Sequence, residues 1–385
     1  MDTADAVVIG GGIAGVSVAA GLAARGLTVT LAEMEPTLAF HTTGRSAAQY
    51  LKNYGNDVVR RLTLASARYF EGGGDGPTPL WSPRPFLRVG DEHHATTLRA
   101  EAAQARALAP TTEFLDGDGA RALVPALAPD VAGALFEPDS MELDVAAVHQ
   151  TFVTRLRRHG GRIATAAPVV ALDPGPSWTV TLADGLVIST PVVVNAAGAW
   201  CDRVAVLAGV TPVGLHPRRR TVAIVAVPDA VGCSGWPLIA FENGEGGMDG
   251  YCKPEPGGLL LSPADETPSE PCDARPEEID VARALDGLDR WTTLGARHVR
   301  STWAGLRTFA ADRSPVVGFA ADGPGFFWMA GQGGYGIQMA PGLAEAATAL
   351  VLDGALPPDL AAAGLVAADL SPDRPGLAGG LAPDH

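Results

Sequence analysis

The first 33 residues combine two hydrophobic patterns. An uninterrupted apolar run, residues 6–9, is followed by glycines and then by an alanine-rich stretch, residues 13–25, that stops at Gly26. A short continuous apolar run is typical of a buried strand, and glycine commonly ends a helix in the left-handed conformation. Residues 27–31, in which leucine or valine alternates with threonine, predict a second strand. The segment therefore predicts a strand–helix–strand unit.

Helical and strand periods return later in the chain. Residues 145–159 have the spacing of an amphipathic helix, and residues 178–182 and 186–189 alternate around an Asp-Gly turn, which predicts a hairpin. In the first half of the chain the sequence further predicts a loop over 40–54 that leads into a helix, a polar helical segment over 92–122, and strands over 162–166 and 191–198. Residues 218–300 are predicted to form mainly β segments, with one helix near 276–288 and a surface linker over 267–276. The C-terminal part predicts a strand over 326–330, a glycine-rich loop over 331–336 and a helix over 337–352. These elements predict a mixed α/β chain.

Length and charge narrow the possible classes. A chain of 385 residues is too long for one compact core and predicts two intertwined domains. The net charge of −15 argues against nucleic acid or an anionic membrane as a partner. No apolar run approaches the roughly 20 residues of a membrane helix, and the start of the chain lacks the features of a signal peptide. We therefore expect no integral membrane segment and a cytoplasmic protein.

Cysteine and histidine spacing gives no metal signature. The four cysteines show no CxxC pair, and the eight histidines show no HxxxH pair. The adjacent His93 and His94 lie in a polar stretch and are expected in a solvated loop. We expect free thiols, most of them packing residues, and no metal site.

The glycines after the first strand predict a dinucleotide site. Gly10, Gly12 and Gly15 form a GxGxxG pattern between the predicted strand and helix, and Glu33 follows at about the spacing of a ribose-binding carboxylate. Only glycine lets a pyrophosphate approach the backbone at a helix N-terminus this closely. The alternative, an ordinary glycine-rich turn, is less favoured because the whole strand–helix–strand context is present.

A second glycine-rich turn, residues 331–336, stands between the last predicted strand and helix. A larger cofactor held at both ends, such as a flavin, explains two such turns, because a helix N-terminus stabilises negative charge on the reduced ring. The alternative is a turn that serves only to start a packing helix.

Motifs spread over nearly the whole chain resemble the D-amino acid oxidase family of FAD-dependent oxidoreductases, and within it most of all the bacterial D-arginine dehydrogenases. The segments that carry the resemblance are residues 43–48, 80–85, 194–202, 217–220, 302–307 and 332–338. The resemblance implies an α/β fold, in which a Rossmann-like FAD-binding domain of the glutathione-reductase type carries an inserted β-rich α+β substrate domain. The implied boundaries are 1–80, 140–215 and 300–385 for the FAD-binding domain, and 81–139 and 216–299 for the substrate-binding domain.

The resemblance also implies a site for an amino acid. It places a carboxylate clamp on Arg220, Arg307 and Tyr251, and a further active-site tyrosine on Tyr54. A guanidinium fork with a phenol is well suited to hold a carboxylate. From the residues alone, Arg307 also fits a structural ion pair, and Arg220 fits a solvated member of a basic triplet.

Three positions depart from the arginine-oxidising relatives. Gln49 stands where they have a histidine, Leu51 where they have a threonine, and Phe86 where a glutamate would grip a guanidinium. Because an unpaired cation beside Phe86 would be costly to bury, we expect an apolar or aromatic substrate side chain. The alternative for Phe86 is a core residue. Together with Gly333, these residues are the expected substrate pocket.

The expected cofactor is non-covalent FAD, since Arg307 is followed by Thr308-Phe309-Ala310 and not by the cysteine that tethers flavin in sarcosine-oxidase-like relatives. Residues 242–250, rich in glycine, predict either a mobile lid or a passive hairpin. The implied cofactor-binding residues are Gly10, Gly12, Ile13, Ala14, Gly15, Glu33, Arg45, Ser46, Ala47, Val170, Gly198, Gly333, Gly334, Gly336, Ile337 and Gln338.

The expected reaction is oxidative deamination of a D-amino acid by hydride transfer from Cα to flavin N5, with Tyr54 and Gln49 as candidate contacts of the amine. One alternative is an oxidase of glycine, an N-methyl amino acid or a cyclic imino acid. Another is a protein that keeps FAD as a structural ligand. The electron acceptor stays open, with oxygen and a quinone among the candidates.

Overall fold

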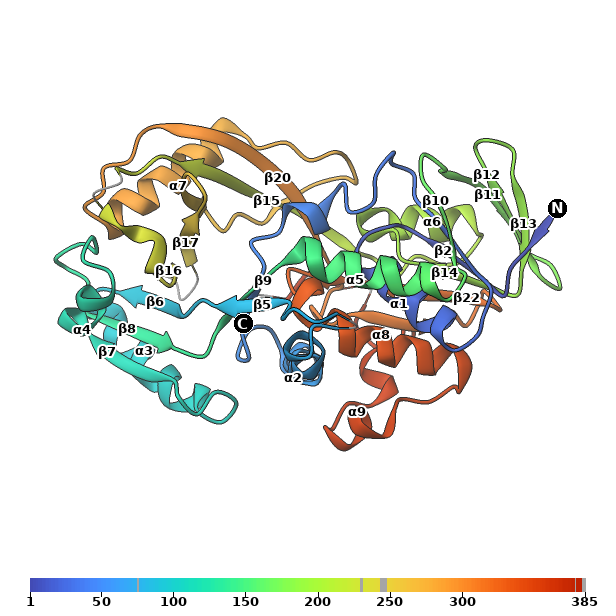
Figure 1. Cartoon of the computed structure of the whole chain (residues 1–385), viewed down its shortest axis with the longest axis horizontal. Coiled ribbons are helices and arrows are strands. Elements are labelled where there is room, and N and C mark those ends of the chain that lie inside the picture. The colour runs from blue at the N-terminus through green and yellow to red at the C-terminus, as the bar shows by residue number, and fades with distance from the viewer. Residues whose placement is uncertain (75, 229–230, 243–247, 378, 383–385) are drawn as a thin grey trace.

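A six-stranded sheet forms the centre of one half of the molecule, at the right of Figure 1. The computed structural model describes residues 1–74, 76–228, 231–242, 248–377 and 379–382. All neighbouring strands of this sheet run parallel except for the last pair. In spatial order its strands are β10 (Arg162–Ala164), β3 (Val29–Ala32), β2 (Ala6–Ile9), β14 (Val192–Asn195), β22 (Phe326–Ala330) and β21 (Val316–Phe319). The mixed α/β prediction and the opening strand–helix–strand unit are confirmed.

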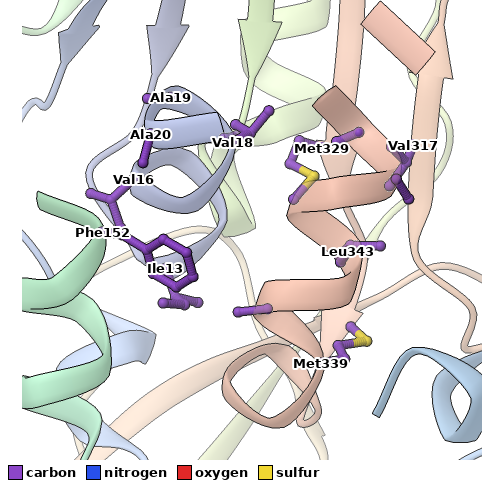
Figure 2. Close-up of a cluster of buried hydrophobic side chains, with 14 of the residues drawn as sticks. Ile13, Val16, Val18, Ala19, Ala20, Phe152, Val317, Met329, Met339 and Leu343 are labelled. Carbon is purple, nitrogen blue, oxygen red and sulfur yellow. The ribbon is translucent and has the colours of Figure 1, made fainter. Parts of the chain in front are cut away.

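Four helices cover one face of this sheet: α1 (Ile13–Ala24), α2 (Asp57–Glu71), α5 (Val145–Arg158) and α8 (Gly336–Leu352). Figure 2 shows Phe152 of α5 beside Ile13 and Val16 of α1, with Leu343 of α8 in the same cluster. All of these side chains are buried, and each fully buried side chain of this size contributes about 1.5–3 kcal/mol. The packing holds the N-termini of α1 and α8 in fixed positions.

A smaller four-stranded sheet covers the other face. Its strands are β1 (Asp2–Thr3), β13 (Val187–Thr190), β12 (Trp178–Leu182) and β11 (Val169–Asp173), and α6 (Cys201–Leu207) packs beside it. The strands pair antiparallel except for β1 and β13, which run parallel. Val8 of β2 belongs to the core on the helical side, whereas Val7 belongs to the core on this side. Successive side chains of a strand point to opposite faces, so a run that is apolar throughout is a strand buried on both sides.

A ten-stranded sheet dominates the other half of the molecule. Its strands are β23 (Gln332–Gly333), β20 (Val299–Phe309), β15 (His216–Val225), β18 (Gly258–Ser262), β17 (Met248–Glu255), β16 (Leu238–Glu242), β6 (Phe86–Gly90), β8 (Gly133–Glu137) and β7 (Glu113–Asp116), with β19 (Thr267–Pro268) paired to β15. The helices of this half are α3 (Glu92–Ala105), α4 (Gly117–Leu123) and α7 (Glu278–Trp291). The long strands β15 and β20 run from this half towards the parallel sheet (Figure 1).

The structure corrects four expectations about local structure. The 40–54 segment contains a 3-10 turn, Thr42–Arg45, and a strand, β4 (Gln49–Tyr50); the helix begins later, after Asn56 caps it by accepting from Val59 N. Strand β4 joins β9 (Met141–Leu143) and β5 (Trp81–Pro83) in a three-stranded sheet.

The segment 92–122 is helical only over α3 and α4, with β7 between them. His93 and His94 open α3 and do not form a loop, because Asp91 caps the helix and also binds the His94 ring. The expected linker over 267–276 begins as β19. Other short elements are the 3-10 turns Gly198–Trp200, Cys233–Gly235 and Ala367–Asp369, and the helix α9 (Pro358–Ala362).

Within the described part of the chain, none of the helices combines the length and the apolar character that crossing a bilayer requires.

Candidate active site

A cavity of about 600 Å³ extends from the N-terminus of α1 to the ten-stranded sheet. This volume lies in the range of cofactor and substrate pockets. Residues that were expected to bind the cofactor and residues that were expected to bind the substrate both line this cavity, so the fold brings together segments that lie far apart in the sequence. Of the expected cofactor residues, Gly15 and Val170 do not line it.

The first glycine turn forms one end of the cavity. Gly10 has a φ of +111°, and a Cβ there would lie 2.4 Å from the Ala196 carbonyl oxygen, so only glycine fits. Gly12 precedes α1 and offers no capping side chain to its first N–H groups. Gly15 has a packing role, since a Cβ there would lie 1.9 Å from the Gly10 oxygen. This third glycine lets the helix approach the strand.

Glu33 lies at the end of β3, is buried, and lines the cavity. Its Oε2 accepts from Gly11 N at 2.5 Å and its Oε1 accepts from Glu35 N at 2.9 Å. A carboxylate has about four acceptor positions, so Glu33 can still receive a ribose hydroxyl.

His149 is a residue of this region that the sequence reading missed. It lies on α5, is buried, and its Nε2 is 3.0 Å from the Gly11 carbonyl oxygen. Burial lowers the pKa of His149 below its usual value, and Nε2 is the donor because the Gly11 carbonyl oxygen can only accept. Nothing in the amphipathic pattern of 145–159 marks this histidine, because only the folded chain brings it to the glycine turn.

The second glycine turn lies along β20. Gly333 pairs with Thr308, and Gly334, Gly336, Ile337 and Gln338 continue along the cavity wall into α8. The turn therefore lies directly beside the end of β20 that carries Arg307.

The remaining expected cofactor residues come from loops. Arg45, Ser46, Ala47 and Gly198 line the cavity. The Arg45 guanidinium donates to the Ala304 carbonyl oxygen at 2.8 Å and pairs with Asp273 at 2.6 Å, which ties its turn to β20. Val170 is half exposed on β11, and its neighbour Val169 lines the cavity instead.

Unsatisfied polar atoms around the cavity fit a polar cofactor. His41 Nδ1, Thr308 Oγ1 and Gln332 Nε2 are buried, line the cavity, and lack a hydrogen-bond partner among the described residues. Leaving such groups unpaired costs about 1–3 kcal/mol each. A cofactor with phosphates, hydroxyls and ring heteroatoms would satisfy them.

The carboxylate-clamp residues converge at the other side of the cavity. Arg307 and Arg220 come from the paired strands β20 and β15 and are both buried. Arg307 Nη2 donates to the Tyr54 hydroxyl at 2.8 Å, and the Arg220 guanidinium lies 5.9 Å from the centre of the Tyr251 ring. All four side chains line the cavity, so the grouping that the resemblance implied is present in space.

Glu266 is a second residue that the sequence reading missed. Its carboxylate accepts from Arg307 Nη1 at 3.1 Å and from Arg313 Nη2 at 2.6 Å, and it lies 3.5 Å from Arg220 Nη2. These arginines lower the pKa of Glu266 although burial opposes the shift. Asp265 Oδ1 also lies 4.0 Å from Arg220 Nε, so two carboxylates face three guanidinium groups, and the cluster keeps a net positive charge that favours an anionic ligand.

The far end of the cavity is less apolar than the sequence predicted. Gln49, Leu51 and Phe86 line it as expected, but Arg88 and Glu242 line it too, with Arg88 Nε 2.6 Å from Glu242 Oε1. Phe86 also packs against the hydrophobic cluster under α3. Side chains alternate along β6, so residues 86 and 88 lie on the same face of the strand. Once Phe86 was expected in the pocket, this alternation could have predicted Arg88 there too.

Glu137 faces Phe86 across the β6–β8 pairing and also lines the cavity. Burial raises the pKa values of both Glu137 and Glu242. The predicted lid or hairpin over 242–250 falls mainly on residues 243–247, which lie outside the described residues. Its flanks, β16 and β17, pair antiparallel from Glu242 and Met248 onwards.

Comparison with known proteins places the chain in a family. Residues 5–350 match the family model described as FAD dependent oxidoreductase (DAO). The chain is similar to the tRNA 5-methylaminomethyl-2-thiouridine biosynthesis bifunctional protein MnmC of Burkholderia multivorans, with 31% identity over 347 residues, covering 82% of this chain and 48% of that protein. The chain thus spans about half the length of that relative.

Solved structures share the fold. Glycine oxidase from Geobacillus kaustophilus superposes with a TM-score of 0.79 at 20% identity, covering 91% of this chain and 95% of that chain. L-proline dehydrogenase from P. horikoshii gives a TM-score of 0.76 at 21% identity, covering 92% and 94%. The family match over residues 5–350 and the shared fold agree, and the chain therefore belongs to the DAO family of FAD-dependent oxidoreductases, with FAD as its cofactor.

Proposed function

We propose that this protein oxidises an amino acid, preferably a D-amino acid with an apolar or aromatic side chain, to an imino acid that water hydrolyses to a 2-oxo acid and ammonia. The observation that carries the proposal is the pair of buried arginines, Arg220 and Arg307, with Tyr54 and Tyr251, in one cavity with the two glycine turns. A cationic cluster with a net positive charge suits the carboxylate that every amino acid carries.

In this proposal the protein acts mainly by orienting the substrate. Arg220 and Arg307 hold the carboxylate, and the hydrogen bond from Arg307 to Tyr54 fixes the phenol beside it. FAD, when bound, supplies the acceptor for the hydride from Cα, with the amine nitrogen's lone pair forming the C=N bond and its N–H proton lost to water. The clamp decides which substrate hydrogen faces the cofactor. The absence of a cysteine directly after Arg307 supports non-covalent attachment.

Leu51 and Phe86 line the cavity and support an apolar portion of the substrate side chain, although the paired Arg88 and Glu242 line the same end. The preference for the D-enantiomer rests on the sequence resemblance. The main alternative is an oxidase of glycine, an N-methyl amino acid or a cyclic imino acid, which the names of two relatives of like fold, glycine oxidase and L-proline dehydrogenase, make worth testing.

The test is anaerobic reduction of the bound flavin by a panel of both enantiomers of the common amino acids, with sarcosine and proline included. We expect bleaching of the yellow colour by D-amino acids with apolar or aromatic side chains, and release of the flavin on denaturation. Arg307→Ala should lose both reduction and carboxylate binding. Bleaching by secondary amines alone would favour the alternative, and an Arg307→Ala protein with unchanged reduction would refute the carboxylate clamp.

A further inference from the structure

The side-chain amide of Gln49 is held by two hydrogen bonds at the wall of the cavity. Its Nε2 donates to the Arg84 carbonyl oxygen at 2.6 Å and to Ser140 Oγ at 2.6 Å. Its Oε1 is buried and has no hydrogen-bond partner among the described residues. A well-anchored amide thus leaves its oxygen as an unused acceptor.

The surrounding hydrogen bonds fix which end of this amide is the oxygen. The Arg84 carbonyl can only accept, and the Ser140 hydroxyl already gives its proton to the Tyr50 carbonyl oxygen at 3.0 Å. Both neighbours of the anchored atom therefore require a donor, so that atom is the nitrogen. Rotating the amide by half a turn would face its oxygen with two acceptors. Ser140 and the Arg84 carbonyl consequently hold Oε1 in one orientation.

The donor for Oε1 is not supplied by the nearby cation. The Arg84 guanidinium is engaged by Glu142 and by the carbonyl oxygens of Ser234 and Trp236. Leaving a buried acceptor unpaired costs free energy, which a ligand bearing an N–H would recover. Gln49 lines the same cavity as the clamp residues, so such a ligand lies within the proposed active site.

We propose that Gln49 Oε1 accepts an N–H from the substrate's amino group and that this contact selects primary and secondary amines over tertiary amines. The inference rests on the proposed amino acid oxidation. An amide is a neutral acceptor that takes up no proton, so it positions the amine and leaves its ionisation to the solvent. The reactive neutral amine has two N–H groups when primary, one when secondary and none when tertiary, so a tertiary amine leaves Oε1 unpaired.

The experiment compares Gln49→Leu, which removes the acceptor at similar size, with Gln150→Leu, the same substitution at an exposed position of α5. The rate of anaerobic flavin reduction and the substrate affinity are measured with the best amino acid and with its N,N-dimethyl derivative. Affinity for benzoate, a carboxylate without an amine, reports on the clamp. We expect Gln49→Leu to lower the efficiency of flavin reduction by the primary amine by about 10–100-fold and to leave benzoate affinity within about twofold. The ratio of this efficiency for the primary amine to that for the tertiary amine should therefore be smaller than in the wild type. Ser140→Ala leaves Gln49 in place and removes one of its two anchors, so it should lower the efficiency of flavin reduction by the primary amine by a smaller factor. This variant replaces Gln49→Leu in the test if Gln49→Leu does not fold.

The inference is overturned if Gln49→Leu reduces no more slowly than Gln150→Leu, or if its benzoate affinity falls in parallel with reduction, as a merely structural role would require. If Ser140→Ala alone is available, reduction equal to the wild type overturns it. A wild-type protein whose flavin no amino acid reduces would instead refute the proposed function itself.

Discussion

Replacing Gly334 by alanine tests the clamp without changing any charge. A Cβ built on Gly334 lies 2.1 Å from Arg307 Nη2, 2.3 Å from Nε and 2.4 Å from Cζ. Gly334 is not among the residues with positive φ, so alanine is otherwise compatible with its backbone. Ordinary contacts of a Cβ lie at 3.4 Å or more, so the guanidinium must withdraw by more than 1 Å. This shift would break its hydrogen bonds to Tyr54 and Glu266.

A misplacement of about 1 Å in a positioning group costs on the order of 100-fold in rate. We therefore expect Gly334→Ala to lower kcat/KM by about 100-fold and to weaken benzoate binding in parallel, because the displaced Arg307 serves both. The assays are anaerobic stopped-flow reduction and benzoate titration of the flavin spectrum, with Tm and flavin content recorded. Gly235→Ala is the control, since a Cβ there meets no atom of the described residues within 4 Å. Turnover and benzoate affinity within twofold of the wild type in a folded, yellow Gly334→Ala protein would refute the assigned role of Arg307.

Two further predictions concern pH. Because burial lowers the pKa of folded His149 below its ordinary value of 6.5, the unfolded chain binds its proton more readily, and stability falls as the pH drops through 6.5. His149→Gln keeps a donor for the Gly11 carbonyl oxygen, so the difference in Tm between pH 8 and pH 5 should shrink; an unchanged difference would contradict this. The pKa of Glu266 is lowered below 4.5, so its stabilisation is present above that pH and is lost as the pH falls through the folded pKa. Glu266→Gln should lower the free energy of unfolding at pH 7 by about 3 kcal/mol and remove this acid dependence in urea titrations, whereas a variant as stable as the wild type would show that Arg307 and Arg313 do not need this partner.

Much of the FAD-binding half could be predicted because its signals are local. The strand β2, the helix α1 and the glycines between them depend on neighbours a few residues away, and their hydrophobic pattern states both the element and its burial. Expectations were weakest over 40–54 and 92–122, where short strands follow polar segments. Strands β4 and β7 are formed by pairing with β9 and β8, and such pairing overrides the local preference.

The residues of the candidate site also fall into those that the sequence could predict and those that it could not. Arg220 and Arg307 could be identified from motifs that they share with a family, and their presence at one cavity agrees with that reading. Glu266, His149 and the orientation of the Gln49 amide could not, since each is defined by partners in other segments. The bond between Arg307 and Tyr54, for example, joins residues 253 positions apart.

The sequence by itself determined the glycine turns, the periods of the strands and helices, and through them the cofactor class and the family. The tertiary structure decided which side chains meet. It placed two carboxylates, Glu266 and Asp265, beside three arginines, put Arg88 and Glu242 at an end of the cavity that had been expected to be apolar, and left one oxygen of Gln49 without a hydrogen-bond partner among the described residues. The physical reason is that turns and periods are set by short-range geometry, whereas charge balance and hydrogen-bond satisfaction in a cavity depend on strands that the chain brings together only when it folds.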